Sequence, residues 1–110
     1  MKEIKAFVKI FKANEILYQL VNAGFPNITV SESEGTGTFK SEDKTEFTRF
    51  SITNSKIAKI EIVCNDNEAD KIIAIILEFG KTGNPGDGII YVSEIQKVYK
   101  VNIGLENGAD

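Results

Sequence analysis

Apolar and polar side chains alternate near the N-terminus and again in the middle of the chain. Between Lys2 and Ile10, every second position from Ile4 onward is apolar and the positions between include Lys5 and Lys9, although Phe7 interrupts this polar face. A similar alternation returns from Lys56 to Cys64. A period of two residues is typical of a strand that buries one face. Both segments are therefore predicted to be β-strands. Cys64, at a buried position of the second, is expected to be an unreactive core residue.

Two further segments show helical spacing. The apolar positions of the first are Ala13, Ile16, Leu17, Leu20 and Val21. Gly24 and Pro26 follow, as is common after a helix C-terminus. The apolar positions of the second are Ala69, Ile72, Ile73, Ile76 and Leu77. Asn65 to Asn67 offer N-caps before it, and Gly80 ends it. Both segments are predicted to be amphipathic helices.

Shorter apolar runs complete the pattern. They predict strands over Asn27 to Ser33, Ile89 to Val92 and Val98 to Ile103, with residues 103–110 as a flexible tail. The resulting β-α-β, β-α-β order is that of the ferredoxin-like fold. We therefore expect one α+β domain over residues 1–110, with both helices on one face of an antiparallel sheet.

The other face of that sheet has no predicted helix to cover it. The large apolar side chains assigned to it are Phe7, Phe11, Ile57, Tyr91 and Tyr99. Because an uncovered apolar face favours association, self-association is expected to cover it.

Residues 38–55 form a polar, charge-mixed segment without periodicity. A loop of this length is unusual within a compact domain and is either disordered or functional. Its aromatic residues Phe39, Phe47 and Phe50 leave two interpretations open. They either pack against one another in extensions of the neighbouring strands, or they form a surface that docks a partner.

Composition excludes several classes of function. The 110 residues include 13 basic and 16 acidic side chains, so the net charge of -3 argues against a nucleic-acid binder. One cysteine and no histidine exclude an intrachain disulfide, a Cys/His zinc cluster and histidine-based catalysis. No nucleophile has an evident base, so an enzyme is not expected. The N-terminal segment lacks the apolar run of a signal peptide or membrane span, which favours a cytoplasmic location.

The strongest local signal is the glycine-rich run Thr82 to Gly88. Glycines let backbone N–H groups converge on an anion, as in phosphate-binding loops, but a simple turn explains the same composition. Asp87, flanked by glycines, also fits an Asx-type turn. Lys56, Lys59 and Lys100 either supply positive charge for a phosphate or are ordinary solvated lysines.

Several segments have counterparts in one known family. They are residues 1–9 with Phe11-Lys12, Ala23-Gly24-Phe25, Thr29-Val30, Gly35-Thr36-Gly37, residues 59–63 and residues 82–88 followed by Ile90-Tyr91-Val92. Through them the chain resembles, over essentially its whole length, the PII family of nitrogen-regulatory signalling proteins. The resemblance implies a homotrimer that binds an adenine nucleotide (ATP, ADP or AMP) in the clefts between subunits. It also implies a long loop that regulates a transporter or an enzyme.

The resemblance implies particular site residues. Gly86, Asp87 and Gly88 would surround the phosphates with backbone donors, and Val63 would lie near the base. The implied nucleotide-binding residues are Thr29, Gly35, Gly37, Thr38, Lys56, Val63, Thr82, Gly83, Gly86, Asp87, Gly88, Ile89, Lys100 and Asn102. The implied partner-binding residues of the loop are Phe39, Phe47, Arg49 and Phe50.

At some of these positions the chain departs from the family. Lys100 and Asn102 occupy the places of two arginines, and Ile89 that of a lysine. Each lost charge-assisted contact contributes about 1.5–3 kcal/mol, so weaker triphosphate binding is expected. Thr38-Phe39 replaces an arginine-glutamine pair, and phenylalanine cannot coordinate magnesium. This argues against magnesium binding and 2-oxoglutarate sensing of the family's standard kind. The alternative function is a nucleotide-independent trimeric interaction module.

Overall fold

The computed structural model describes residues 1–35, 55–102 and 104–106, and the long segment between Gly35 and Ser55 lies outside the described residues. In chain order the elements are β1 (Lys2–Lys9), the 3-10 helix η1 (Ile10–Lys12), α1 (Ala13–Asn22), β2 (Thr29–Gly35), β3 (Ser55–Cys64), the 3-10 helix η4 (Asp66–Glu68), α2 (Ala69–Gly80), β4 (Gly88–Glu94), β5 (Val98–Lys100) and β6 (Gly104–Glu106). The two predicted helices and the alternating strands are confirmed.

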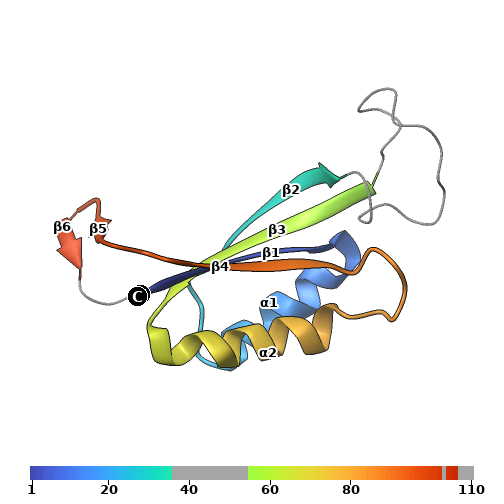
Figure 1. Ribbon diagram of the computed structural model, residues 1–110, viewed down its shortest axis with the longest axis horizontal. Coiled ribbons are helices and arrows are strands. Elements are labelled where there is room, and N and C mark those ends of the chain that lie inside the picture. Colours follow the sequence, from blue (N-terminus) through green and yellow to red (C-terminus); the bar gives the residue numbers. More distant parts are fainter. Residues whose placement is uncertain (36–54, 103, 107–110) are drawn as a thin grey trace.

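Four strands form one antiparallel sheet in the order β2-β3-β1-β4, and β5 pairs with β6 in a separate two-stranded sheet. Both helices lie on the same side of the larger sheet (Figure 1). This arrangement and the element order confirm the predicted ferredoxin-like fold. Figure 1 also shows β5 and β6 extending beyond one end of the sheet.

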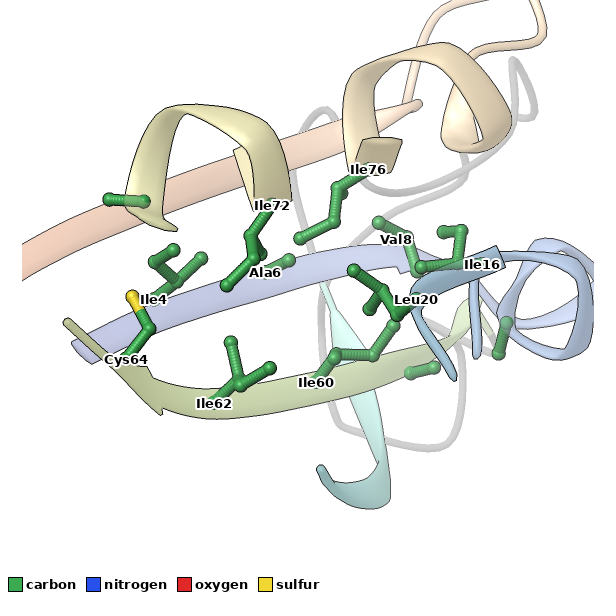
Figure 2. Packing of buried hydrophobic residues seen from close by; sticks show 13 residues of the cluster. Ile4, Ala6, Val8, Ile16, Leu20, Ile60, Ile62, Cys64, Ile72 and Ile76 are labelled. Atoms are coloured by element: carbon green, nitrogen blue, oxygen red, sulfur yellow. The ribbon is translucent and has the colours of Figure 1, made fainter. Parts of the chain in front are cut away.

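The core lies between the sheet and the helices (Figure 2). Its main members are Ile4, Ala6 and Val8 of β1, Ile60, Ile62 and Cys64 of β3, Ile16 and Leu20 of α1, and Ile72 and Ile76 of α2. Alternate strand residues face one side of a sheet, which explains why the period-two pattern located them. Cys64 is buried, as predicted.

The buried stripe of each helix is narrower than the sequence suggested. Val21 of α1 is 50% exposed and Leu77 of α2 is 54% exposed, although both have helical spacing with buried residues. Successive helix positions are rotated by about 100°, so Leu77 points away from the contact that buries Ile76. Leu77 instead lines the border between α2 and β4.

Strand boundaries follow pairing more than local composition. The strand predicted over Asn27 to Ser33 is shifted to Thr29–Gly35, because its residues pair with β3 from Thr29↔Glu61 to Gly35↔Ser55. The prediction for Val98 to Ile103 is shortened to β5, Val98–Lys100. Gly104–Glu106, assigned from the sequence to the tail, form β6 by pairing with β5.

The sheet face opposite the helices carries part of the predicted apolar set. Phe7 and Tyr91 meet edge to face on it, with ring centroids 5.9 Å apart. Phe11 and Tyr99 are exposed but lie in η1 and β5, outside this sheet. Ile57 is buried. Among the described residues, the aromatic surface of this face therefore consists of fewer of the predicted side chains and centres on Phe7 and Tyr91. No helix among the described residues is long and apolar enough to span a membrane.

Candidate functional site

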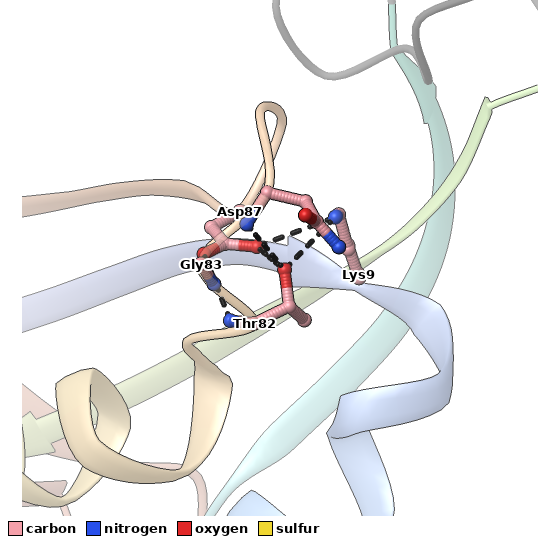
Figure 3. Close-up of polar contacts among 5 residues, drawn as sticks. Lys9, Thr82, Gly83 and Asp87 are labelled. Atoms are coloured by element: carbon pink, nitrogen blue, oxygen red, sulfur yellow. Dashed lines mark hydrogen bonds and ion pairs between the residues drawn. The ribbon is translucent and has the colours of Figure 1, made fainter.

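The glycine-rich loop 82–88 joins α2 to β4 and is closed by a side chain of its own (Figure 3). Asp87 Oδ2 accepts hydrogen bonds from the backbone N–H groups of Thr82, at 2.8 Å, and Gly83, at 3.0 Å. The Thr82 hydroxyl donates to Asp87 Oδ1. Thr82 Oγ1 in turn accepts the N–H of Asn84 at 3.0 Å. The loop thus folds around a carboxylate.

Lys9, at the end of β1, completes this polar cluster. Its Nζ lies 3.3 Å from Asp87 Oδ1 and donates to Thr82 Oγ1 at 3.2 Å. The side chains of Lys9 and Asp87 are 19% and 27% exposed, so the ion pair is largely shielded from solvent. We call Lys9, Thr82 and Asp87 the clasp of the loop.

The clasp stabilises the charged form of Asp87. Burial of the carboxyl group opposes its ionisation. The hydrogen bonds that it accepts have the larger opposite effect on the pKa; their donors are the Thr82 hydroxyl, the N–H groups of Thr82 and Gly83, and Lys9. Together they hold the pKa of Asp87 far below its ordinary value. The carboxylate is therefore ionised throughout the physiological pH range.

Glycines give the loop its shape. Gly83, Gly86 and Gly88 have φ angles of +87°, +87° and +122°, a region that side chains disfavour. Gly88 is also the point where the loop meets the sheet. A Cβ atom there would lie 1.8 Å from the carbonyl oxygen of Phe7. Close backbone approach therefore requires glycine at this position.

A groove of about 410 Å³ runs beside the loop, between α2 and β4. Its lining is mostly apolar and includes Ile73, Leu77, Ile90 and Val92, while Asp87 also contributes to the lining. Asp87, Gly88 and Ile89 of this lining are also predicted nucleotide-binding residues, so the groove adjoins the predicted site although most of its surface is apolar.

The structure brings only some of the predicted site residues together. Gly35 ends β2, Lys56 lies near the start of β3, and the loop 82–88 leads into β4, whose first residue is Gly88. Since the strands are antiparallel, Gly35, Lys56, Lys9 and Gly88 all lie at one end of the sheet. This end carries the root of the segment between Gly35 and Ser55 and also the glycine-rich loop (Figure 1).

Other predicted residues lie far from that end. Val63 pairs with Glu3 near the opposite end of the sheet, and Thr29 pairs with Glu61. Lys100 is in β5, and Asn102 follows it. One chain alone does not bring these residues to the loop 82–88. The predicted residues Gly37, Thr38, Phe39, Phe47, Arg49 and Phe50 fall outside the described residues.

Within the loop, the observed contacts are internal hydrogen bonds, whereas the predicted contacts were to a ligand. Thr82 and Gly83 were expected to face a ligand, and their N–H groups are bonded to Asp87. A ligand contact from either residue stays a prediction. Sequence reasoning missed Lys9, which is 73 positions from Thr82. The Asx-turn interpretation of Asp87 was the one signal that pointed to an internal role.

Comparison with known proteins agrees with the fold. Residues 1–104 match the sequence model of the family described as nitrogen regulatory protein P-II. A protein of that name from Nostoc punctiforme is 33% identical, with 97% of this chain and 96% of the relative covered. Another from Mesorhizobium japonicum is 37% identical, with 100% and 98% covered. The chain belongs to the P-II family of nitrogen regulatory proteins, as its sequence resemblance implied.

Proposed function

We propose that this P-II family member is a cytoplasmic signalling protein that binds an adenine nucleotide in the clefts of a homotrimer. The long loop 38–55 then regulates a partner, either a membrane transporter or a metabolic enzyme. The observation that carries the proposal is a pre-shaped glycine loop beside the root of that segment, in a chain matched by the family over residues 1–104.

The distribution of the predicted residues supports a site shared between subunits. The loop 82–88 lies at one end of the sheet, while Val63, Lys100 and Asn102 lie at or beyond the other. A second copy is needed to bring residues of both groups to one ligand. The aromatic pair Phe7 and Tyr91, on the sheet face without helices, is an apolar surface that such an assembly can bury.

Regulation would follow from a shift in population. A nucleotide bound at the root of the long segment shifts the populations of the segment's conformations only if it binds one conformation more tightly than another. The size of the shift is set by that difference in affinity. Ile89, where the family has a lysine, is expected to weaken the contribution of a third phosphate. ADP and AMP are therefore ligands to compare directly with ATP.

Isothermal titration with ATP, ADP and AMP tests this function. We expect one nucleotide per subunit for at least one of the three. Gly86→Ala should abolish or strongly weaken binding, because the φ of +87° disfavours a side chain in the loop. Gly24→Ala is the matched control, since Gly24 also has positive φ, at +99°, but lies just after α1. Absence of binding to all three nucleotides would contradict the proposal.

A nucleotide-independent interaction module is the second candidate. The observation that favours it is that the N–H groups of Thr82, Gly83 and Asn84 are already engaged within the loop. Substituting Gly86 and Lys100 together separates the two functions. A pure interaction module keeps its partner binding after both changes, whereas a nucleotide-dependent regulator loses its response to the nucleotide.

A further inference from the structure

Loop 82–88 already contains an anion, the carboxylate of Asp87. Convergent backbone N–H groups normally attract a phosphate or another external anion. Here the N–H groups of Thr82 and Gly83 converge on Asp87 Oδ2 instead. The first part of the loop is therefore satisfied without a ligand.

A carboxylate at this position would repel an incoming phosphate if its charge were not balanced. Lys9 balances it, with Nζ at 3.3 Å from Oδ1 in a partly buried pair. Lys9 belongs to β1, which pairs with both β3 and β4 in the middle of the sheet. The ion pair therefore also connects the loop to one of the two central strands of the sheet.

We propose that Lys9, Thr82 and Asp87 are positioning residues that set the shape of the loop before a nucleotide binds. They direct the ligand to the N–H groups of Gly86 and Asp87 and not to those of Thr82, Gly83 and Asn84. This inference rests on the proposed function for the identity of the ligand. The closed state of the loop does not depend on it.

Amide hydrogen exchange, measured by NMR on the full chain without ligand, tests the closed state. The amides of Gly83 and Asn84 should be protected in the wild type. Thr82→Val removes the hydroxyl and should make both exchange about tenfold faster, as expected for about 1.4 kcal/mol of lost hydrogen bonding. Thr82→Ser keeps the hydroxyl and should restore protection to within about twofold. Unprotected amides in the wild type would overturn the inference.

Binding of ATP tests the positioning role. Lys9→Met should weaken ATP binding about tenfold, which is about 1.4 kcal/mol. Lys81→Met removes the same charge nearby, from a lysine without an ion pair among the described residues, and should change affinity less than about twofold. ATP should add protection at Gly86 and Asp87 and none at Gly83. Equal losses in the two lysine variants, or new protection at Gly83, would overturn the proposal.

The two levels of failure are distinguishable. If the wild type binds none of ATP, ADP and AMP, the proposed function is wrong. The exchange of Gly83 and Asn84 in the Thr82→Val and Thr82→Ser variants then still decides whether the clasp closes the loop. If the nucleotides bind and the variants neither lose protection nor lose affinity, the clasp is wrong and the proposed function stands.

Discussion

At the scale of single residues, Gly88 has less room for a side chain than Gly24, Gly80 or Gly83. Its φ is +122°, and the backbone oxygen of Phe7 lies where a Cβ atom would be. Neither the φ angle nor the position of this oxygen can change without a shift of β1 or β4. Gly83 has positive φ as well, but nothing lies within 4 Å of its hypothetical Cβ. A side chain at Gly83 would therefore cause backbone strain alone, whereas one at Gly88 would cause both strain and steric overlap.

Gly88→Ala should destabilise the protein by more than about 3 kcal/mol, because strain and overlap act together. Gly83→Ala should cost only about 1–2 kcal/mol, the penalty for a left-handed alanine. Urea unfolding followed by circular dichroism measures both. Equal losses would mean that the contact between Gly88 and Phe7 is not present in solution.

Asp87 predicts a dependence of stability on pH. Its pKa is depressed in the folded state, so its contribution is present in full above the unfolded-state value of about 3.9 and is lost as the pH falls further. Asp87→Asn should cost about 1–2 kcal/mol at pH 7, and the difference from the wild type should shrink below pH 4. Thermal unfolding between pH 7 and pH 2 measures it.

Glu78→Gln is the control for this titration, because Glu78 is exposed on α2 and makes no ion pair among the described residues. At pH 7 its free energy of unfolding should stay within about 0.5 kcal/mol of the wild type. A constant difference between wild type and Asp87→Asn down to pH 2 would contradict the assigned hydrogen bonds.

At the scale of elements, α2 shows how far a sequence pattern reaches. Spacing located the helix and its inner face, because a period of 3.6 residues follows from helix geometry itself. The spacing could not predict which residues at the edge of the stripe are buried, because Leu77 and Ile76 both fit an apolar stripe. Only the position of β4 relative to α2 leaves Leu77 at the border.

Substitutions on α2 should reflect this difference. Ile72→Ala removes a side chain with 0% exposure and should destabilise by about 2–5 kcal/mol through lost burial and a cavity. Leu77→Ala, at 54% exposure, should cost about 1 kcal/mol or less. Chemical unfolding of the two variants gives the comparison. A larger loss for Leu77→Ala would place that side chain in a buried contact.

The strands and the site differ in how well they could be predicted. Alternation identified β1 and β3 because each buries one face against the helices. The tail segment 104–106 has no such pattern, and its pairing with β5 depends on a neighbour in space. The clasp was beyond sequence reasoning for the same reason, since Lys9 reaches Asp87 only through the pairing of β1 with β4.

At the scale of the whole molecule, the two helices of the described residues cover the same face of the four-stranded sheet. Phe7 and Tyr91 lie on the other face, and Tyr91 is 53% exposed. Exposed aromatic residues in a cluster favour association, which agrees with the proposed homotrimer.

Sedimentation should therefore report three copies of the 12.1 kDa chain, about 36 kDa. Tyr91→Lys, which places a charge on this face, should shift the protein toward the monomer. Tyr18→Lys is the matched control, because Tyr18 is 61% exposed on α1, on the helical side. A monomeric wild type, or equal effects of both changes, would contradict assembly through the sheet face.

The pairing of Gly35 with Ser55 has a consequence for protein engineering. It holds both anchor points of the intervening segment side by side, through the sheet and independently of that segment's length. Doubling the length of a flexible closed segment costs only about 0.6 kcal/mol, so the domain should accept a grafted peptide or a reporter between these anchors.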